Sequence, residues 1–247
     1  MKTDRQWYEI KAETGSAADI WIYEEIGENF WGEGLTAKQF VTDLAALSVD
    51  HIALHINSPG GNVFDGQAIY NALQRHPARV TSHVEGLAAS IASVVALAGD
   101  TVEMAENALF MIHDPYGMAM GTAADMRQMA EVLDKVRGTI LGVYERKSGG
   151  DPEAILEAMA AETWYTAAEA RAAGYADSVA APVKAAALTR FDFNSLGYRH
   201  VPDALAHADR TAADAFEAPR ATSFEDRQSR DLVHTPGYFR SLRKEGR

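Results

Sequence analysis

The chain has 247 residues and a formal net charge of −12, with 47% apolar and 23% charged residues. Such a composition is typical of a globular domain that buries a core without disulfides or metals, alone or with an appendage. The absence of cysteine excludes thiol catalysis, disulfides and cysteine-based zinc sites. The start lacks a signal-peptide core, and the apolar run 87–99 is too short to span a bilayer, which predicts a cytoplasmic protein without a membrane partner.

The charge is unevenly distributed along the chain. Residues 1–180 hold 12 Lys and Arg against 26 Asp and Glu, whereas residues 181–247 hold 11 against 9. The acidic body predicts no nucleic-acid partner. We expect an N-terminal segment over 1–17, a domain over 18–180, and an extension over 181–247 that is flexible or binds a partner.

Predicted strands and helices alternate through the first half of the chain. The strand predictions cover 19–27, 51–57, 79–86, 101–105 and 108–113. The helix predictions cover 36–48, 63–76 and 88–99. This alternation predicts an α/β fold with a mainly parallel sheet and right-handed crossovers.

Helical patterns dominate the rest of the domain. Apolar residues spaced by three or four predict a long helix over 122–147, and a second helix follows the Gly-Gly break with Pro152 in its first turn. A capping box from Thr166 to Glu169 predicts a helix that Gly174 ends. A last strand is predicted over 175–179.

The stretch "INSPGGNVFDG", residues 56–66, lies between a predicted strand and a predicted helix. Its glycines allow a sharp turn and can present backbone N–H groups without a side chain in the way. The Gly-x-Gly-x-x-Gly spacing of a dinucleotide site is absent. Taken alone, the stretch is typical of an ordinary turn.

The stretch "GLAAS" ends at Ser90, after a predicted strand that ends at Gly86. A serine in the first turn of the next helix can act as a nucleophile, because the free N–H groups there favour a developing negative charge. It can equally be a capping hydroxyl, with Ser93 as a small packing residue. The segment alone favours the capping role.

The stretch "FMIHDP" places His113 at the end of a strand, where an imidazole can act as a general base or simply occupy a turn. The remaining histidines of the domain, His51, His55, His76 and His83, show no zinc-ligand spacing with a carboxylate. The sequence therefore predicts no metal and no cofactor.

Together, "INSPGG", "GLAAS" and "FMIHDP" resemble in order and spacing the Clp protease proteolytic subunit, peptidase family S14, over about residues 18–180. The resemblance implies a Clp/crotonase-like fold of repeated ββα units and a serine endopeptidase. It implies Ser90 as the nucleophile and His113 as the general base. It also implies an oxyanion hole made by the backbone N–H groups of Gly61 and Ile91.

The third member of the implied triad departs from the family pattern. In "AETWYTAAEA", Glu162 stands where the family usually has aspartate. A glutamate can also accept the imidazole N–H, as in some other triads. We rank Glu162 above Asp114, which is adjacent to His113 and should point the other way.

The resemblance also implies polypeptide substrates and a homo-oligomeric ring. The basic residue that the family has beside the triad acid is missing, since Ala161 and Thr163 flank Glu162. The predicted helix over 122–147 matches the long helix, called the "handle", that packs subunits across ring faces in the family. The alternative is an ordinary amphipathic helix. No Walker motif occurs, so any ATP dependence requires a separate AAA+ unfoldase.

The stretch "FWGEGLTAKQF", the Glu-Thr-Trp stretch and the long extension resemble head maturation proteases of phages and prophages more than the housekeeping peptidase. This implies scaffold or capsid proteins as partners, and the extension is either a docking segment or a linker. The alternatives are a housekeeping-like Clp subunit, a crotonase-type acyl-CoA enzyme, a signal-peptide-peptidase relative, and a catalytically weak head-assembly protein that keeps the fold.

Overall fold

The computed structural model describes residues 7–12, 16–27, 36–182, 191–193, 195–202 and 205. The strands are β1 (Tyr8–Ala12), β2 (Ala17–Ile22), β3 (His51–Ser58), β4 (Arg79–Ala89), β5 (Thr101–Ala105), β6 (Leu109–Ile112), β7 (Thr163–Thr166) and β8 (Ser178–Ala180). The helices are α1 (Ala37–Ala45), α2 (Val63–Arg75), α3 (Ile91–Ala96), α4 (Ala123–Ser148), α5 (Pro152–Ala160) and α6 (Ala167–Ala172).

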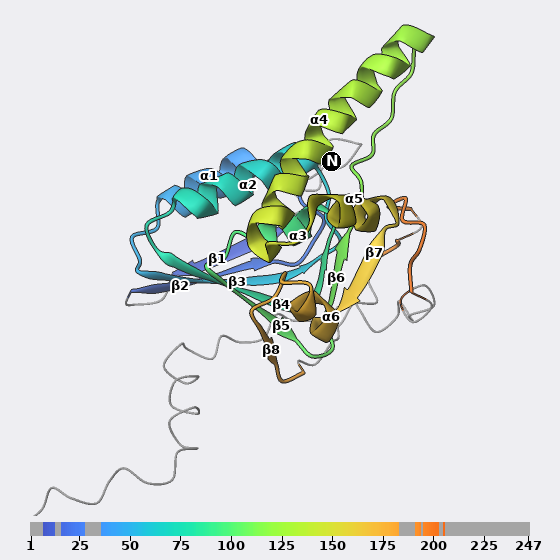
Figure 1. Cartoon of the computed structure of the whole chain (residues 1–247). Helices are drawn as coiled ribbons and strands as arrows, with labels where there is room; N and C mark the ends of the chain where they lie inside the picture. Colours follow the sequence, from blue (N-terminus) through green and yellow to red (C-terminus); the bar gives the residue numbers. More distant parts are fainter. Residues whose placement is uncertain are drawn as a thin grey trace, which may run out of the picture. The chain divides into compact units, whose positions relative to one another are not determined.

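The strands form one mixed sheet in the order β1-β2-β3-β4-β5-β8 (Figure 1). The pairs from β2 to β5 and from β5 to β8 are parallel, whereas β1 pairs antiparallel with β2. The predicted α/β fold with a mainly parallel sheet is therefore confirmed.

Strand β4 is long enough to pair with two different strands on the same side. Its first half pairs with β5, and its last residues pair in parallel with β6, with Ala89 opposite Met111. Strand β7 then pairs antiparallel with β6, with Thr163 opposite Ile112. This branch brings the C-terminal ends of β4 and β6 next to the N-terminal end of β7.

Helices α1, α2 and α3 cover one face of the sheet (Figure 1). Alternate strand residues such as Ile20, Leu54 and Val84 are buried in the main core beneath them, as the period of a strand with one covered face requires. Helix α4 has its buried residues, Val136, Ile140, Val143 and Tyr144, in its C-terminal half. Its N-terminal half extends away from the body of the domain (Figure 1).

A second, smaller core covers the other face of the β4, β6 and β7 branch. Leu87 and Ala89 of β4, Met111 of β6 and Trp164 of β7 meet the aromatic residues Phe191, Phe193 and Tyr198 there. We call residues 191–193 and 195–201 the C-terminal strap. These strap residues belong to the predicted extension, most of whose remaining residues lie outside the described part of the chain.

Several boundaries differ from the sequence predictions. Strand β4 runs to Ala89 rather than ending at Gly86, because residues 87–89 pair with β6. Helix α3 consequently begins at Ile91 and not at residue 88. Strands β1 and β7 were not predicted. The long helix, the Thr166 capping box and the first-turn Pro152 are confirmed.

In the part of the chain that the structure describes, no helix combines the length and the apolar character needed to cross a membrane.

Candidate active site

The branch of the sheet places three candidate residues next to one another, each one position beyond a strand end. Ser90 follows β4, His113 follows β6 and Glu162 precedes β7. The Ser90 N–H donates to the carbonyl of Met111 at 3.0 Å, which continues the β4 and β6 ladder to the site. Strand pairing alone therefore brings together residues that are far apart in the sequence.

Ser90 occupies a strained turn between strand and helix. Its φ of 55° and ψ of −130° lie outside the regions that a serine ordinarily adopts. Its Oγ lies 2.8 Å from Nε2 of His113, within hydrogen-bond distance. The turn directs the hydroxyl to the imidazole instead of capping α3, since Ser90 makes no side-chain cap hydrogen bond.

Backbone strain marks the acid position as well. Among the described non-glycine residues, positive φ occurs only at Ser90 and at Glu162, whose φ is 51°. Strained residues of this kind gather at functional sites, where the surrounding structure holds them in place. The two positions of strain thus coincide with two of the predicted triad residues.

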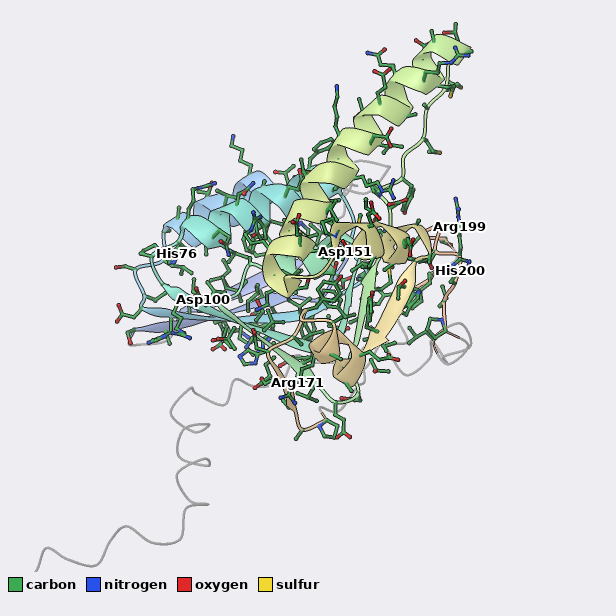
Figure 2. All side chains as sticks on the ribbon, viewed as in Figure 1. His76, Asp100, Asp151, Arg171, Arg199 and His200 are labelled. Atoms are coloured by element: carbon green, nitrogen blue, oxygen red, sulfur yellow. The ribbon has the colours of Figure 1, made fainter. Side chains whose placement is uncertain are left out.

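Glu162 is 7% exposed, and its carboxylate is bound by the C-terminal strap. Its oxygens accept from the backbone N–H of Arg199 at 2.9 and 3.0 Å and from that of His200 at 2.8 Å. Both residues lie beside the start of β7 (Figure 2). Within the described residues no hydrogen bond joins Glu162 to His113, so the carboxylate acts on the imidazole through its charge.

The glycine turn after β3 lies directly beside Ser90. Gly60 and Gly61 have φ of 102° and 140°, and a Cβ on Gly60 would lie 2.7 Å from Cβ of Ser90. The Gly60 carbonyl accepts from Ile26 N–H at 2.6 Å, and Asn62 N–H donates to the Ile26 carbonyl at 2.9 Å. Because alternate backbone groups of an extended chain point to opposite sides, the Gly61 N–H points away from Ile26.

A second backbone donor comes from helix α3. Its first residue is Ile91, and the N–H groups of a first helical turn have no acceptor within their own helix. Gly61, Ser90, Ile91 and His113 line the same crevice. The crevice continues along apolar side chains, which are Val63, Phe64, Val94, Ile140 and Tyr144. It can therefore accommodate an extended chain next to the hydroxyl.

Ser93 has a different role from that of Ser90. It is fully buried, and its Oγ lies 2.5 Å from the Ser90 carbonyl and 2.6 Å from the Tyr144 hydroxyl. The prediction that Ser93 is a packing residue is confirmed.

The electrostatic environment favours a neutral imidazole. Burial lowers the pKa of His113 below its ordinary value, and the positive charge of Arg199 acts in the same direction. The negative charges of Glu162 and Asp114 oppose this effect. A neutral imidazole can accept a proton, as a general base must.

The other titratable candidates are engaged elsewhere. Asp114 forms an ion pair with Arg137, with 2.8 Å between Oδ1 and Nε. His55 is buried in β3 between the carboxylates of Asp19 and Glu85, at 2.9 and 2.8 Å. Over the described residues, no group of three or more His, Cys, Asp or Glu is arranged to hold a metal ion.

Sequence reasoning did not find the residues that the C-terminal strap contributes. Tyr198 stacks on the His113 ring, with 5.4 Å between centroids and 29° between planes, and its hydroxyl donates to the Pro59 carbonyl. The available signal was the group of aromatic residues in "FDFNSLGY", which is unusual for an extension rich in Ala, Arg and Asp.

A serine at the start of a helix and beside a glycine turn, with its hydroxyl hydrogen-bonded to a histidine, is typical of serine hydrolases. The family model of the Clp protease matches residues 2–183. The chain therefore belongs to the Clp protease family, whose members are serine endopeptidases.

Curated relatives carry the same family name. The chain is similar to the ATP-dependent Clp protease proteolytic subunit 3 of Streptomyces coelicolor, with 35% identity over 152 residues, 59% of this chain and 70% of that protein. It is 36% identical to the proteolytic subunit of Leuconostoc citreum over 132 residues, 52% of this chain and 66% of that protein. It is 28% identical to subunit 1 of Leifsonia xyli over 162 residues, 65% of this chain and 81% of that protein.

Proposed function

We propose that the chain hydrolyses peptide bonds by acyl transfer, with Ser90 as the nucleophile and His113 as the general base. The observation that carries this proposal is the 2.8 Å hydrogen bond between Ser90 Oγ and His113 Nε2. In the first step, Oγ attacks the peptide carbonyl carbon while Nε2 accepts the hydroxyl proton. The imidazolium then gives this proton to the leaving amine, and water hydrolyses the acyl-enzyme.

The oxyanion of the tetrahedral intermediate is bound, in this proposal, by the N–H groups of Gly61 and Ile91. Support comes from their common position in the crevice beside Ser90 and from the orientation of the Gly61 N–H. Such donors are effective because they are held in place before the charge develops.

Glu162 acts, in this proposal, by stabilising the imidazolium that forms at His113. Its negative charge raises the pKa of His113, and the backbone N–H groups of Arg199 and His200 hold its carboxylate in place. The absence of a direct hydrogen bond among the described atoms distinguishes it from a triad acid that orients the imidazole N–H.

The proposed substrates are polypeptides, and the proposed assembly is a homo-oligomer. The N-terminal half of α4 supports the assembly, because it extends from the domain and leaves apolar residues exposed near it. These are Met118 and Met120 in the connection before the helix, and Met126 and Val132 in the helix. An AAA+ unfoldase partner, a role in phage head maturation and contacts of the extension with scaffold or capsid proteins all stay predictions.

The proposal is tested by incubating the purified full-length chain with an unfolded polypeptide and following new amino termini. We expect cleavage that a fluorophosphonate abolishes, because the reagent phosphorylates an activated serine. The oligomeric state is measured on the same sample. A folded oligomer that cleaves nothing and does not react with the reagent would contradict the proposal.

The pH dependence of activity should respond to charge near His113. Glu162→Gln removes a negative charge that favours the imidazolium, so the pKa of His113 falls and the acid limb of kcat/KM moves to lower pH. Arg199→Ala removes a positive charge, so the limb moves to higher pH.

Profiles of kcat/KM against pH measure both shifts. Lys38→Ala is the control, because Lys38 is an exposed residue of α1 and is not among the charged groups that act on His113. Shifts of Glu162→Gln and Arg199→Ala in the same direction would show that His113 is not the group that titrates.

A further inference from the structure

The C-terminal strap contacts the candidate site at several points, although it lies beyond the matched family region, which ends at residue 183. Its aromatic residues Phe191 and Phe193 anchor it in the second core. The hydroxyl of Tyr116, which lies in the connection between β6 and α4, donates to the Leu196 carbonyl at 2.6 Å. These anchors hold the strap immediately before the positions 198–200 where it meets the site.

Tyr198 is the residue of the strap nearest to the proposed reacting groups. Its side chain is 8% exposed, its ring stacks on His113, and its hydroxyl donates to the carbonyl of Pro59. Pro59 immediately precedes Gly60 and Gly61, so one side chain connects the imidazole with the glycine turn. Burial raises the pKa of the Tyr198 phenol, while the Ser90 side chain lowers it. The phenol remains protonated and can donate at neutral pH.

The next two residues fix the acid. The N–H groups of Arg199 and His200 bind the Glu162 carboxylate, and Nδ1 of His200 lies 2.8 Å from the Ala161 carbonyl. Three consecutive strap residues thus contact the base, the glycine turn and the acid. Residues whose own positions are fixed by packing are the kind that hold a catalytic geometry in place.

We propose that Tyr198 is a positioning residue for the peptidase reaction, and that the strap completes an active site which the family-matched domain alone leaves unfinished. This inference rests on the proposed function. Tyr198 holds the His113 ring in the plane that faces Ser90 Oγ, and it holds the turn that presents the Gly61 N–H. The Ser90 to His113 hydrogen bond is intact with the strap in place, which favours a supporting role over an inhibitory one.

The test compares Tyr198→Ala and Tyr198→Phe in the full chain with Tyr8→Phe. Tyr8 is also buried, and its hydroxyl donates to Asp43 at 2.6 Å in α1, so Tyr8→Phe removes a comparable hydrogen bond elsewhere. We expect Tyr198→Ala to lower kcat about 10²-fold with KM nearly unchanged, because misplaced reacting groups cost about this much. Tyr198→Phe should lower kcat about tenfold, and Tyr8→Phe should keep wild-type kcat.

The pH profile separates positioning from a loss of folded protein. Tyr198→Ala exposes the His113 ring, so burial lowers its pKa less and the acid limb moves to higher pH. Tyr198→Phe keeps the ring and should leave the limb in place. If Tyr198→Ala does not fold, Tyr198→Phe alone tests the positioning role, because it retains the packing of the ring.

Fluorophosphonate labelling distinguishes this inference from the proposed function. If wild-type Ser90 is not labelled, the proposed function fails. If wild-type Ser90 is labelled and both Tyr198 variants react at the wild-type rate, the strap proposal is overturned. Where Tyr198→Ala does not fold, a wild-type rate of Tyr198→Phe alone overturns it. Faster reaction of either variant overturns it as well, because it would make the strap inhibitory.

Discussion

Ser90→Ala should lose about 10⁶-fold in turnover, the loss found when the nucleophile of a serine hydrolase is removed. The structure gives the reason: Ser90 Oγ is the hydroxyl within 2.8 Å of His113 Nε2. His113→Ala should cost about as much, and the double variant should be no worse than either single one, because nucleophile and base act as a unit. Steady-state hydrolysis of a peptide substrate measures all three.

Ser93→Ala is the matched control, since it removes a hydroxyl three residues away on the same segment. It leaves the buried Tyr144 hydroxyl without its Ser93 partner, which should lower the free energy of unfolding by about 1–3 kcal/mol. Turnover per folded molecule should stay near wild type. An active Ser90→Ala would show that Ser90 is not the nucleophile. An inactive but folded Ser93→Ala would show that Ser93 is more than a packing residue.

Gly61→Ala should lower kcat about 10²- to 10³-fold, the cost of losing one oxyanion donor. A Cβ at Gly61 would lie 2.2 Å from the carbonyl oxygen of Ile26. The turn must therefore move, and the Gly61 N–H moves with it. Kinetics at saturating substrate should show the loss in kcat, because the donor acts on charge that develops in the transition state.

The control for backbone strain is Gly149→Ala at the C-cap of α4. Gly149 has a φ of 65°, but a Cβ there would meet nothing within 4 Å. This variant should lose some stability and keep kcat. If both glycine variants keep wild-type kcat, Gly61 does not supply an oxyanion donor.

The sequence predicted the helices and parallel strands well because their apolar residues recur with the period of a single buried face. It also singled out Ser90, His113 and Glu162, which the structure places one position from neighbouring strand ends, and it predicted the packing role of Ser93. It missed the end of β4 because residues 87–89 are small and apolar, which suits a buried helix as well as a strand. Only pairing with β6, a tertiary contact, distinguishes the two.

The contacts of Glu162 could not be predicted from local pattern. Its carboxylate is bound by backbone N–H groups of Arg199 and His200, and any residue except proline can supply such a donor. Tyr198 likewise stacks on His113 although the two are 85 residues apart in the sequence. No periodic pattern in the sequence predicts such a contact.

Whether Ser90 is the nucleophile is tested most directly by reacting the full-length protein with a fluorophosphonate and locating the adduct by peptide mass spectrometry. We expect one adduct, on Ser90, whose formation His113→Ala slows strongly and Ser93→Ala leaves unchanged. An adduct on another residue, or no adduct on a folded protein that cleaves polypeptides, would contradict this expectation.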